Sequence, residues 1–224
     1  TSAARSVCIG KSAGANTTSA DNSVAIGYQA MGTGVTTGDD NIAIGQLAGN
    51  DLTSGGGNVL IGKSAGENQT TPNDNVAIGN GCMALGTVTG GDNVIVGRRT
   101  AEDLTSGTYN VILGDMAGLN ATSFLQNVVI GKNALGAGVA TGESNVVIGF
   151  EAGEDITNSD SAVYIGAGAG KQHTSSAHSV IIGHDAGGSG IGTGQGSVLI
   201  GKKAGKDLTS GADNVLVGSS AGTA

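Results

Sequence analysis

A five-residue block recurs thirteen times along the chain: a small, mostly polar residue, three apolar residues and a glycine. The first copy spans residues 6–10 and the last spans residues 214–218. Successive closing glycines lie 17 or 18 residues apart, and every third interval is the longer one. Short β-branched runs between turn residues predict strands. Because a fixed period of this size is typical of solenoids, we expect an all-β, parallel β-solenoid of about thirteen coils.

The segments between strands predict tight corners of three alternating types. The third residue after the closing glycine is almost always alanine, and a glycine commonly follows it. Long coils continue into a Gly/Thr/Val stretch such as residues 32–38. The two short types carry Asp, or Asn/Gln, with threonine two residues later, so side chains can satisfy turn amides. The predicted turn ladder is Asp51, Thr53, Asp103, Thr105, Asp155, Thr157, Asp207 and Thr209.

The regular period extends over the whole chain without a linker or a charge block. We therefore expect a single elongated domain over residues 1–224. Asparagine precedes the strand in eight of the thirteen coils, and identical stacked polar residues form hydrogen-bonded ladders. The chain begins and stops in mid-coil, since Thr1 aligns with the column of Thr209 and Ala224 lies six residues after Gly218. This pattern favours a fragment of a longer fibre.

The strand blocks are apolar at all three positions. Successive side chains of a strand point to opposite faces. We expect the flanking residues, such as Val24 and Ile26, to face the coil interior and the middle residue to point outward. A solvated face would be polar, so we expect this face to be covered, by another copy of the chain or by a third layer within one wide coil. The predicted chain–chain interface is Ala25, Ala43, Leu60, Ala77, Ile95, Ile112, Val129, Val147, Tyr164, Ile181, Leu199 and Leu216.

The block Ser23-Val24-Ala25-Ile26-Gly27 resembles the head repeat of the trimeric autotransporter adhesins, the YadA-like head, and similar repeats occur in phage tail fibres. The resemblance covers the whole chain through the thirteen blocks and the small-residue column after them. It implies a left-handed parallel β-roll, with three rolls packed as a trimer around an axis through this strand. These coils are longer than the family's usual coil. A two-sided β-roll and a three-sided β-helix therefore both stay open.

Composition narrows the possible partners. Apolar residues make up 38% of the chain but aromatic residues only 2%, so Val, Ile, Leu and Ala must build the core. The formal net charge of −8 argues against a nucleic-acid partner. No stretch approaches the roughly 18 apolar residues of a membrane helix, so we expect no membrane insertion in this segment. Cys8 and Cys82 lie four coils apart, about 19 Å at strand spacing, which is too far for a disulfide.

Two sequence motifs are repeat positions. Residues 57–64 match the phosphate-loop pattern of nucleotide-binding proteins, but the residues between its glycines include a strand block, whereas phosphate binding needs a flexible loop before a helix. Asn16, Asn68 and Asn120 match the N-glycosylation pattern because the Asx-x-Thr column recurs. We therefore interpret both motifs as strand and turn chemistry, and expect no cofactor.

The sequence offers no candidate residues for catalysis or metal binding either. His173, His178 and His184 occupy three different columns, so they are expected as surface or turn histidines and not as convergent metal ligands. The aspartate column that begins with Asp51 recurs about every 14 Å, too far for one calcium site. No position breaks the repeat to bring a nucleophile and a base together. We expect neither a metal site nor an enzyme.

These observations favour a structural and adhesive fibre module, a bacterial adhesin head or a phage tail-fibre segment. A stiff rod would present a receptor- or surface-binding face, and threefold copies would raise avidity. The expected partners are a homotrimer and a receptor on a host-cell or matrix surface, glycans included, at an extracellular, cell-surface or virion location. Two alternatives stay open: an ice-binding solenoid, because a threonine column runs along the chain, and a self-assembling extracellular filament or matrix protein.

Overall fold

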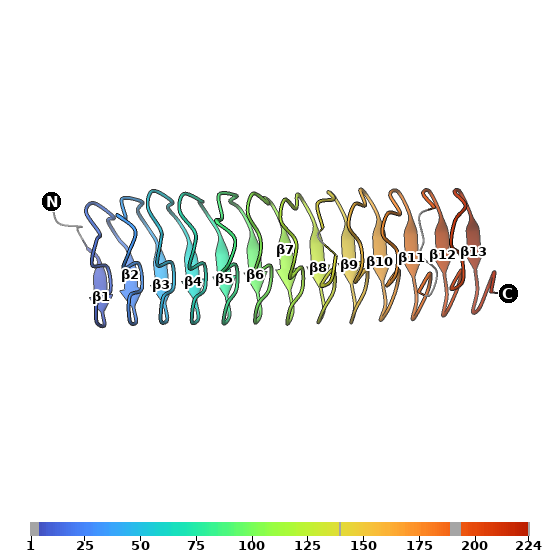
Figure 1. Cartoon of the computed structure of the whole chain (residues 1–224), viewed down its shortest axis with the longest axis horizontal. Coiled ribbons are helices and arrows are strands. Elements are labelled where there is room, and N and C mark those ends of the chain that lie inside the picture. The colour runs from blue at the N-terminus through green and yellow to red at the C-terminus, as the bar shows by residue number, and fades with distance from the viewer. Residues whose placement is uncertain (1–4, 139, 189–193, 224) are drawn as a thin grey trace. The chain divides into compact units, whose positions relative to one another are not determined.

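The computed structural model describes residues 5–138, 140–188 and 194–223. Its thirteen strands are parallel and follow chain order in the sheet, so the predicted all-β, parallel β-solenoid is confirmed. Figure 1 shows that each coil contributes one strand. The strands are β1 (Val7–Ile9), β2 (Val24–Ile26), β3 (Ile42–Ile44), β4 (Val59–Ile61), β5 (Val76–Ile78), β6 (Val94–Val96), β7 (Val111–Leu113), β8 (Val128–Ile130), β9 (Val146–Ile148), β10 (Val163–Ile165), β11 (Val180–Ile182), β12 (Val198–Ile200) and β13 (Val215–Val217).

The chain divides into two compact units. The first, Thr1–Tyr109, contains β1 to β6, and the second, Asn110–Ala224, contains β7 to β13. Within each unit the strands pair in register by whole coils, as Leu60 with Ala77 in β4 and β5. Turns, bends and irregular segments make up most of the rest of each described coil, and an isolated parallel bridge joins Leu125 and Glu143. The single domain over residues 1–224 stays a prediction, and Thr1 and Ala224, on which the mid-coil ends were argued, lie outside the described residues.

The closing glycine of each block is required by both conformation and stacking. Gly62 has a φ of +133°, a region that side chains rarely adopt. A Cβ atom on Gly62 would lie 2.5 Å from the carbonyl oxygen of Gly79 in the next coil. Successive closing glycines therefore stack backbone on backbone, which no other residue allows.

An asparagine ladder runs along the start of the strands and confirms the predicted stacking. The Nδ2 of Asn58 donates to Oδ1 of Asn41, 3.0 Å away in the preceding coil, and to the carbonyl oxygen of Pro72, 2.8 Å away. The backbone N–H of Asn75 donates to Oδ1 of Asn58 at 3.1 Å. All three asparagines are fully buried. Because buried amides must be paired, these bonds fix the register of neighbouring coils.

The coil interior differs between short and long coils. The fourth residue after the closing glycine has positive φ throughout, and short coils mostly place glycine there, as at Gly66. A Cβ on Gly66 would lie 2.9 Å from Cδ2 of the buried Leu60. Long coils instead carry Met31, Met83 and Leu135 at this position, and their side chains are buried in the core. Three of the four long coils therefore fill the interior with a larger side chain, and the last has Gly187 at this position.

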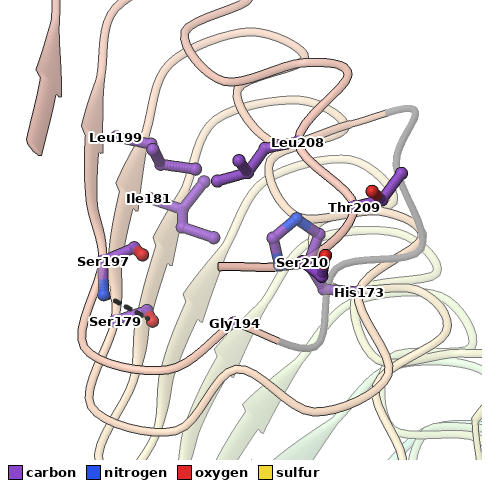
Figure 2. A pocket seen from close by; sticks show the side chains of 9 residues that line it. All are labelled: His173, Ser179, Ile181, Gly194, Ser197, Leu199, Leu208, Thr209 and Ser210. Carbon is purple, nitrogen blue, oxygen red and sulfur yellow. Dashed lines mark hydrogen bonds between the residues drawn. The ribbon is translucent and has the colours of Figure 1, made fainter. Parts of the chain in front are cut away.

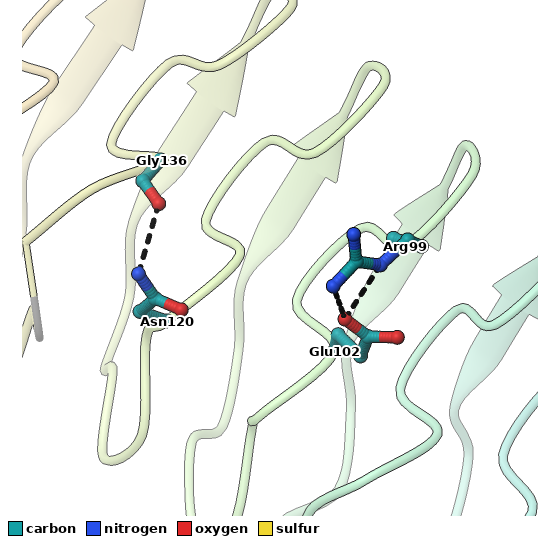
Figure 3. A network of polar contacts seen from close by, with 4 residues as sticks. All are labelled: Arg99, Glu102, Asn120 and Gly136. Atoms are coloured by element: carbon teal, nitrogen blue, oxygen red, sulfur yellow. Dashed lines mark hydrogen bonds and ion pairs between the residues drawn. The ribbon is translucent and has the colours of Figure 1, made fainter.

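A second set of hydrogen bonds connects the long coils to their neighbours. In the coils before the first three long coils, an asparagine side chain donates across to backbone carbonyls. The Nδ2 of Asn120 lies 3.1 Å from the carbonyl oxygens of both Gly136 and Ala137, and Figure 3 shows the first of these bonds. Asn16 makes the equivalent bonds to Gly32 and Thr33, at 3.2 and 3.0 Å. Asparagine rather than aspartate stands here because the acceptors are carbonyls, which need a donor.

Candidate interaction surface

The outer face of the sheet is formed by the residues that flank the middle position of each strand. In most strands the burial pattern is half-buried, buried, half-buried, as in β4 and β5. Val94 and Ile200 are 40% and 37% exposed. In each unit, Val, Ile and Leu therefore form two outward-facing columns. These columns flank the column of middle residues, which points inward.

This arrangement corrects the predicted direction of the strands. The middle residues were expected to point outward and form a chain–chain interface, but all except the last are at most 2% exposed in a single chain. Leu216 is half-buried. The corrected positions are Ala25, Ala43, Leu60, Ala77, Ile95, Ile112, Val129, Val147, Tyr164, Ile181, Leu199 and Leu216.

The physical reason for the correction lies in the asparagine ladder. Asn58 precedes Leu60 by two residues, and strand alternation places both side chains on the same side. Because the Asn58 amide is buried while it caps the neighbouring coils, Leu60 must also point inward. The asparagine column was the signal in the sequence that would have oriented the strand.

Because the middle residues point inward, the flanking Val, Ile and Leu residues form an apolar outer surface. An exposed sheet face normally carries polar residues, because only the packed face gains from apolar side chains. Here both faces are apolar, and the outer columns continue through every strand of each unit. Contiguous apolar surface of this kind marks an interaction site in soluble proteins.

The predicted turn ladder is formed by different bonds from those expected. The hydroxyl of Thr53 donates to the carbonyl oxygen of Thr70 at 2.8 Å, and that of Thr157 donates to Thr174 at 3.1 Å. These threonines connect neighbouring coils, whereas the sequence suggested bonds to amides of their own corner. Asp51 and Asp155 are half-buried, and Thr209 is exposed.

The remaining ladder positions lie in two different settings. Burial, reinforced by the adjacent Glu102 carboxylate and opposed by Arg99, raises the pKa of Asp103 above its ordinary value. Arg99 is paired with Glu102, with 2.6 Å between Nη2 and Oε2, as Figure 3 shows. Thr105 is half-buried and Asp207 is exposed. The ladder side chains lie at or near the surface of the coil, and they do not gather around a common ligand position.

One histidine is buried, contrary to the expectation for all three. His173 is 3% exposed, and its Nδ1 lies 2.6 Å from Oγ of the buried Ser176. Burial lowers the pKa of His173 to about 4, partly offset by the Gly187 backbone. A Cβ on Gly187 would lie 2.8 Å from Nε2 of His173, so glycine at this long-coil position makes room for the imidazole. His178 and His184 are exposed, as expected.

Figure 2 shows a recess beside His173, lined also by Ile181, Leu199, Leu208 and serine, threonine and glycine residues. Its cavity volume is about 10 Å³, far below the usual range of ligand pockets. Nε2 of His173 has no partner of normal hydrogen-bond geometry among the described residues. The recess is therefore too small for a typical ligand, and one nitrogen without a hydrogen-bond partner among the described residues lies on its wall.

The described residues contain neither a candidate metal cluster nor a membrane-spanning helix. Across residues 5–138, 140–188 and 194–223, no three His, Cys, Asp or Glu side chains gather in a way that could hold a metal ion. That same part of the chain contains no helix long and apolar enough to span a bilayer. A scan against protein-family models and a search of curated proteins both found no match to this chain.

Proposed function

We propose that the chain is a segment of a self-associating fibre, in which copies pack together through the outward Val and Ile columns. The single observation that supports this proposal is the apolar outer face of the sheet. Full burial of an exposed Val or Ile side chain contributes about 1.5–3 kcal/mol. The side chains of these columns are already half-buried, so each adds a part of that value, and two continuous columns together supply a driving force for association. A trimer is the proposed state, because three copies can point this face toward one axis.

The proposed role of the fibre is adhesion. A stack of coils with in-register hydrogen bonds is stiff, and the copies in one assembly repeat each lateral feature. A receptor on a host-cell or matrix surface, with glycans as one class, would then meet several equivalent sites at once. The proposed location is extracellular, on a cell surface or virion, as a bacterial adhesin head or a phage tail-fibre segment, and the role includes no catalysis.

The solution mass of the chain tests the association. Sedimentation or light scattering should give three times the 21.5 kDa chain mass. Replacing Val59, Val76 and Val94 by threonine keeps strand propensity but removes about 1 kcal/mol of apolar burial at each site, so the apparent dissociation constant should rise about 100-fold. Val35→Thr is a matched control, because Val35 is 55% exposed and lies off the sheet. A monomeric wild-type chain at all concentrations would refute the proposal.

Adhesion is tested separately with the same variants. Wild-type protein and the triple threonine variant are compared for binding to glycan arrays and to cultured cells. If avidity operates, the variant should lose surface binding far more than it loses affinity for a soluble ligand. Equal surface binding by both proteins would count against a role for multivalency.

Ice binding is a second candidate, favoured by a specific observation. Thr53 and Thr70 occupy the same position in two successive coils, as do Thr157 and Thr174, and each is exposed or half-buried. The hydroxyls of Thr53 and Thr157 both donate to a carbonyl of the next coil, which holds them in one orientation. A regular row of oriented hydroxyls suits a crystalline lattice. Thermal hysteresis in the wild-type chain that is abolished by Thr53→Val would support this candidate, and its absence would exclude it.

A further inference from the structure

The apolar face of the first unit is bordered by opposite charges. We define the end edge as the first and second residues after each closing glycine, and the start edge as the second and third residues before each strand. Along β1 to β6 the end edge carries four basic residues and no acid: Lys11, Lys63, Arg98 and Arg99. The start edge carries five carboxylates and Arg5: Asp21, Asp39, Asp40, Asp74 and Asp92. Asp21, Asp39 and Arg99 alternate to the opposite side. The apolar face therefore has Lys11, Lys63 and Arg98 along one edge and Asp40, Asp74, Asp92 and Arg5 along the other, a difference of about five charges.

One column of each edge lies on the same side of the sheet as the apolar columns. Around β5, Asp74 and Asn80 are exposed and Val76 and Ile78 half-buried, whereas the intervening Asn75 and Ala77 are buried. Alternation therefore places the second residue before each strand, the two apolar columns and the first residue after each closing glycine on one surface. Six residue steps separate the edges, roughly 20 Å at strand spacing, too far for an ion pair within one copy.

We propose that this face docks a second copy of the chain whose coils stack in the same direction, with the end edge of one copy beside the start edge of the next. This inference rests on the proposed self-association and adds its orientation. Rotation about an axis parallel to the stacking direction brings basic edges against acidic edges, in a pair or in a ring of three. Copies stacked in opposite directions would face each other with basic against basic and acidic against acidic.

The orientation determines the sign of the salt dependence. Exposed charges beyond about 8–10 Å are screened at physiological ionic strength, and closer pairs weaken as salt rises. With unlike edges together, raising NaCl from about 20 to 500 mM should weaken association. With like edges together, the same change should strengthen it. The wild-type chain alone therefore distinguishes the two orientations by sedimentation.

Charge reversal gives the second test. One variant carries Lys11→Glu and Lys63→Glu, another carries Asp40→Lys and Asp74→Lys, and a third carries all four changes. The start-edge column already accepts long side chains at positive φ, as at Arg5 and Gln126, so lysine fits there. Each single-edge variant should associate about tenfold more weakly at low salt, since every exposed pair is worth about 0.2–1 kcal/mol. The four-site variant should return to within about threefold of wild type.

The outcomes separate this inference from the proposed function. A wild-type chain that stays monomeric overturns both. An oligomer that dissociates in the triple threonine variant but strengthens with salt, or ignores the edge reversals, keeps the association and overturns the orientation. Circular dichroism of each variant shows that the fold is retained. Weakening by either single-edge reversal, with recovery in the four-site variant, supports the parallel orientation.

Discussion

The bonds of Asn120 lead to a sharp prediction about the three-coil superperiod. Its amide donates to the carbonyl oxygens of Gly136 and Ala137, both at 3.1 Å, where the long coil departs from the spacing of its neighbour. In Asn120→Asp, a carboxylate of the same shape would face these two carbonyls without a proton to donate. Two lost hydrogen bonds at about 0.5–1.5 kcal/mol each predict a loss of about 1–3 kcal/mol in the free energy of unfolding.

Asp155→Asn is the matched control. Asp155 stands in the equivalent column of a coil that precedes a short coil, and it is half-buried like Asn120. Removing its charge should change the free energy of unfolding by no more than about 0.5 kcal/mol. The two substitutions exchange the same pair of residues in opposite directions. Intrinsic propensity alone would therefore predict changes of equal size and opposite sign, and not a loss in one variant with little change in the other.

Equilibrium urea unfolding measures the loss, and amide hydrogen exchange locates it. Stacked coils need not unfold in one step, so a local measurement is required beside the global one. Protection at Ala137 and Gly138, whose N–H groups bond to the carbonyl of Glu154, should fall before protection in β8 and β9. Protonation of the new carboxyl restores a donor, so the variant should recover towards wild type below about pH 4. Unchanged stability and unchanged exchange at 137–138 would refute the reasoning.

Three further predictions address the stacking, the buried histidine and the thiols. Gly62→Ala should cost about 3 kcal/mol or more in urea unfolding, because its Cβ would lie 2.5 Å from the Gly79 oxygen at a φ of +133°; an unchanged midpoint would contradict the backbone stacking. His173 titrates near pH 4 in the folded chain and near 6.5 unfolded, so the unfolded state binds more protons and stability should fall by about 3 kcal/mol between pH 6.5 and 4. His173→Gln should remove most of that slope, and a slope equal to wild type would show that other groups cause it. Cys8 is exposed, whereas burial raises the pKa of Cys82 to about 12, so a thiol reagent should modify one cysteine quickly and the second only on unfolding; two fast thiols would contradict the burial of Cys82.

Much of the fold followed from the repeated block. The closing glycines, the β-branched runs and the constant spacing predicted thirteen strands, and the structure places one strand in each block. The stacked asparagines were predicted as a ladder, and Asn41, Asn58 and Asn75 form one. These features are local or strictly periodic, so each coil carries the information needed to place it on the next.

Tertiary structure decided the direction of the strands and the use of the interior. Alternation establishes that Ala77 and its neighbours Val76 and Ile78 point to opposite sides, but not which side is inside. That choice depends on the buried asparagine amides and on side chains from other coils. The burial of His173 likewise depends on the missing side chain at Gly187, which belongs to the next coil. The sequence by itself determined the period and an apolar strand with two apolar faces. Only the packing of successive coils decided which face fills the core and which points outward, because interior volume is shared between neighbours.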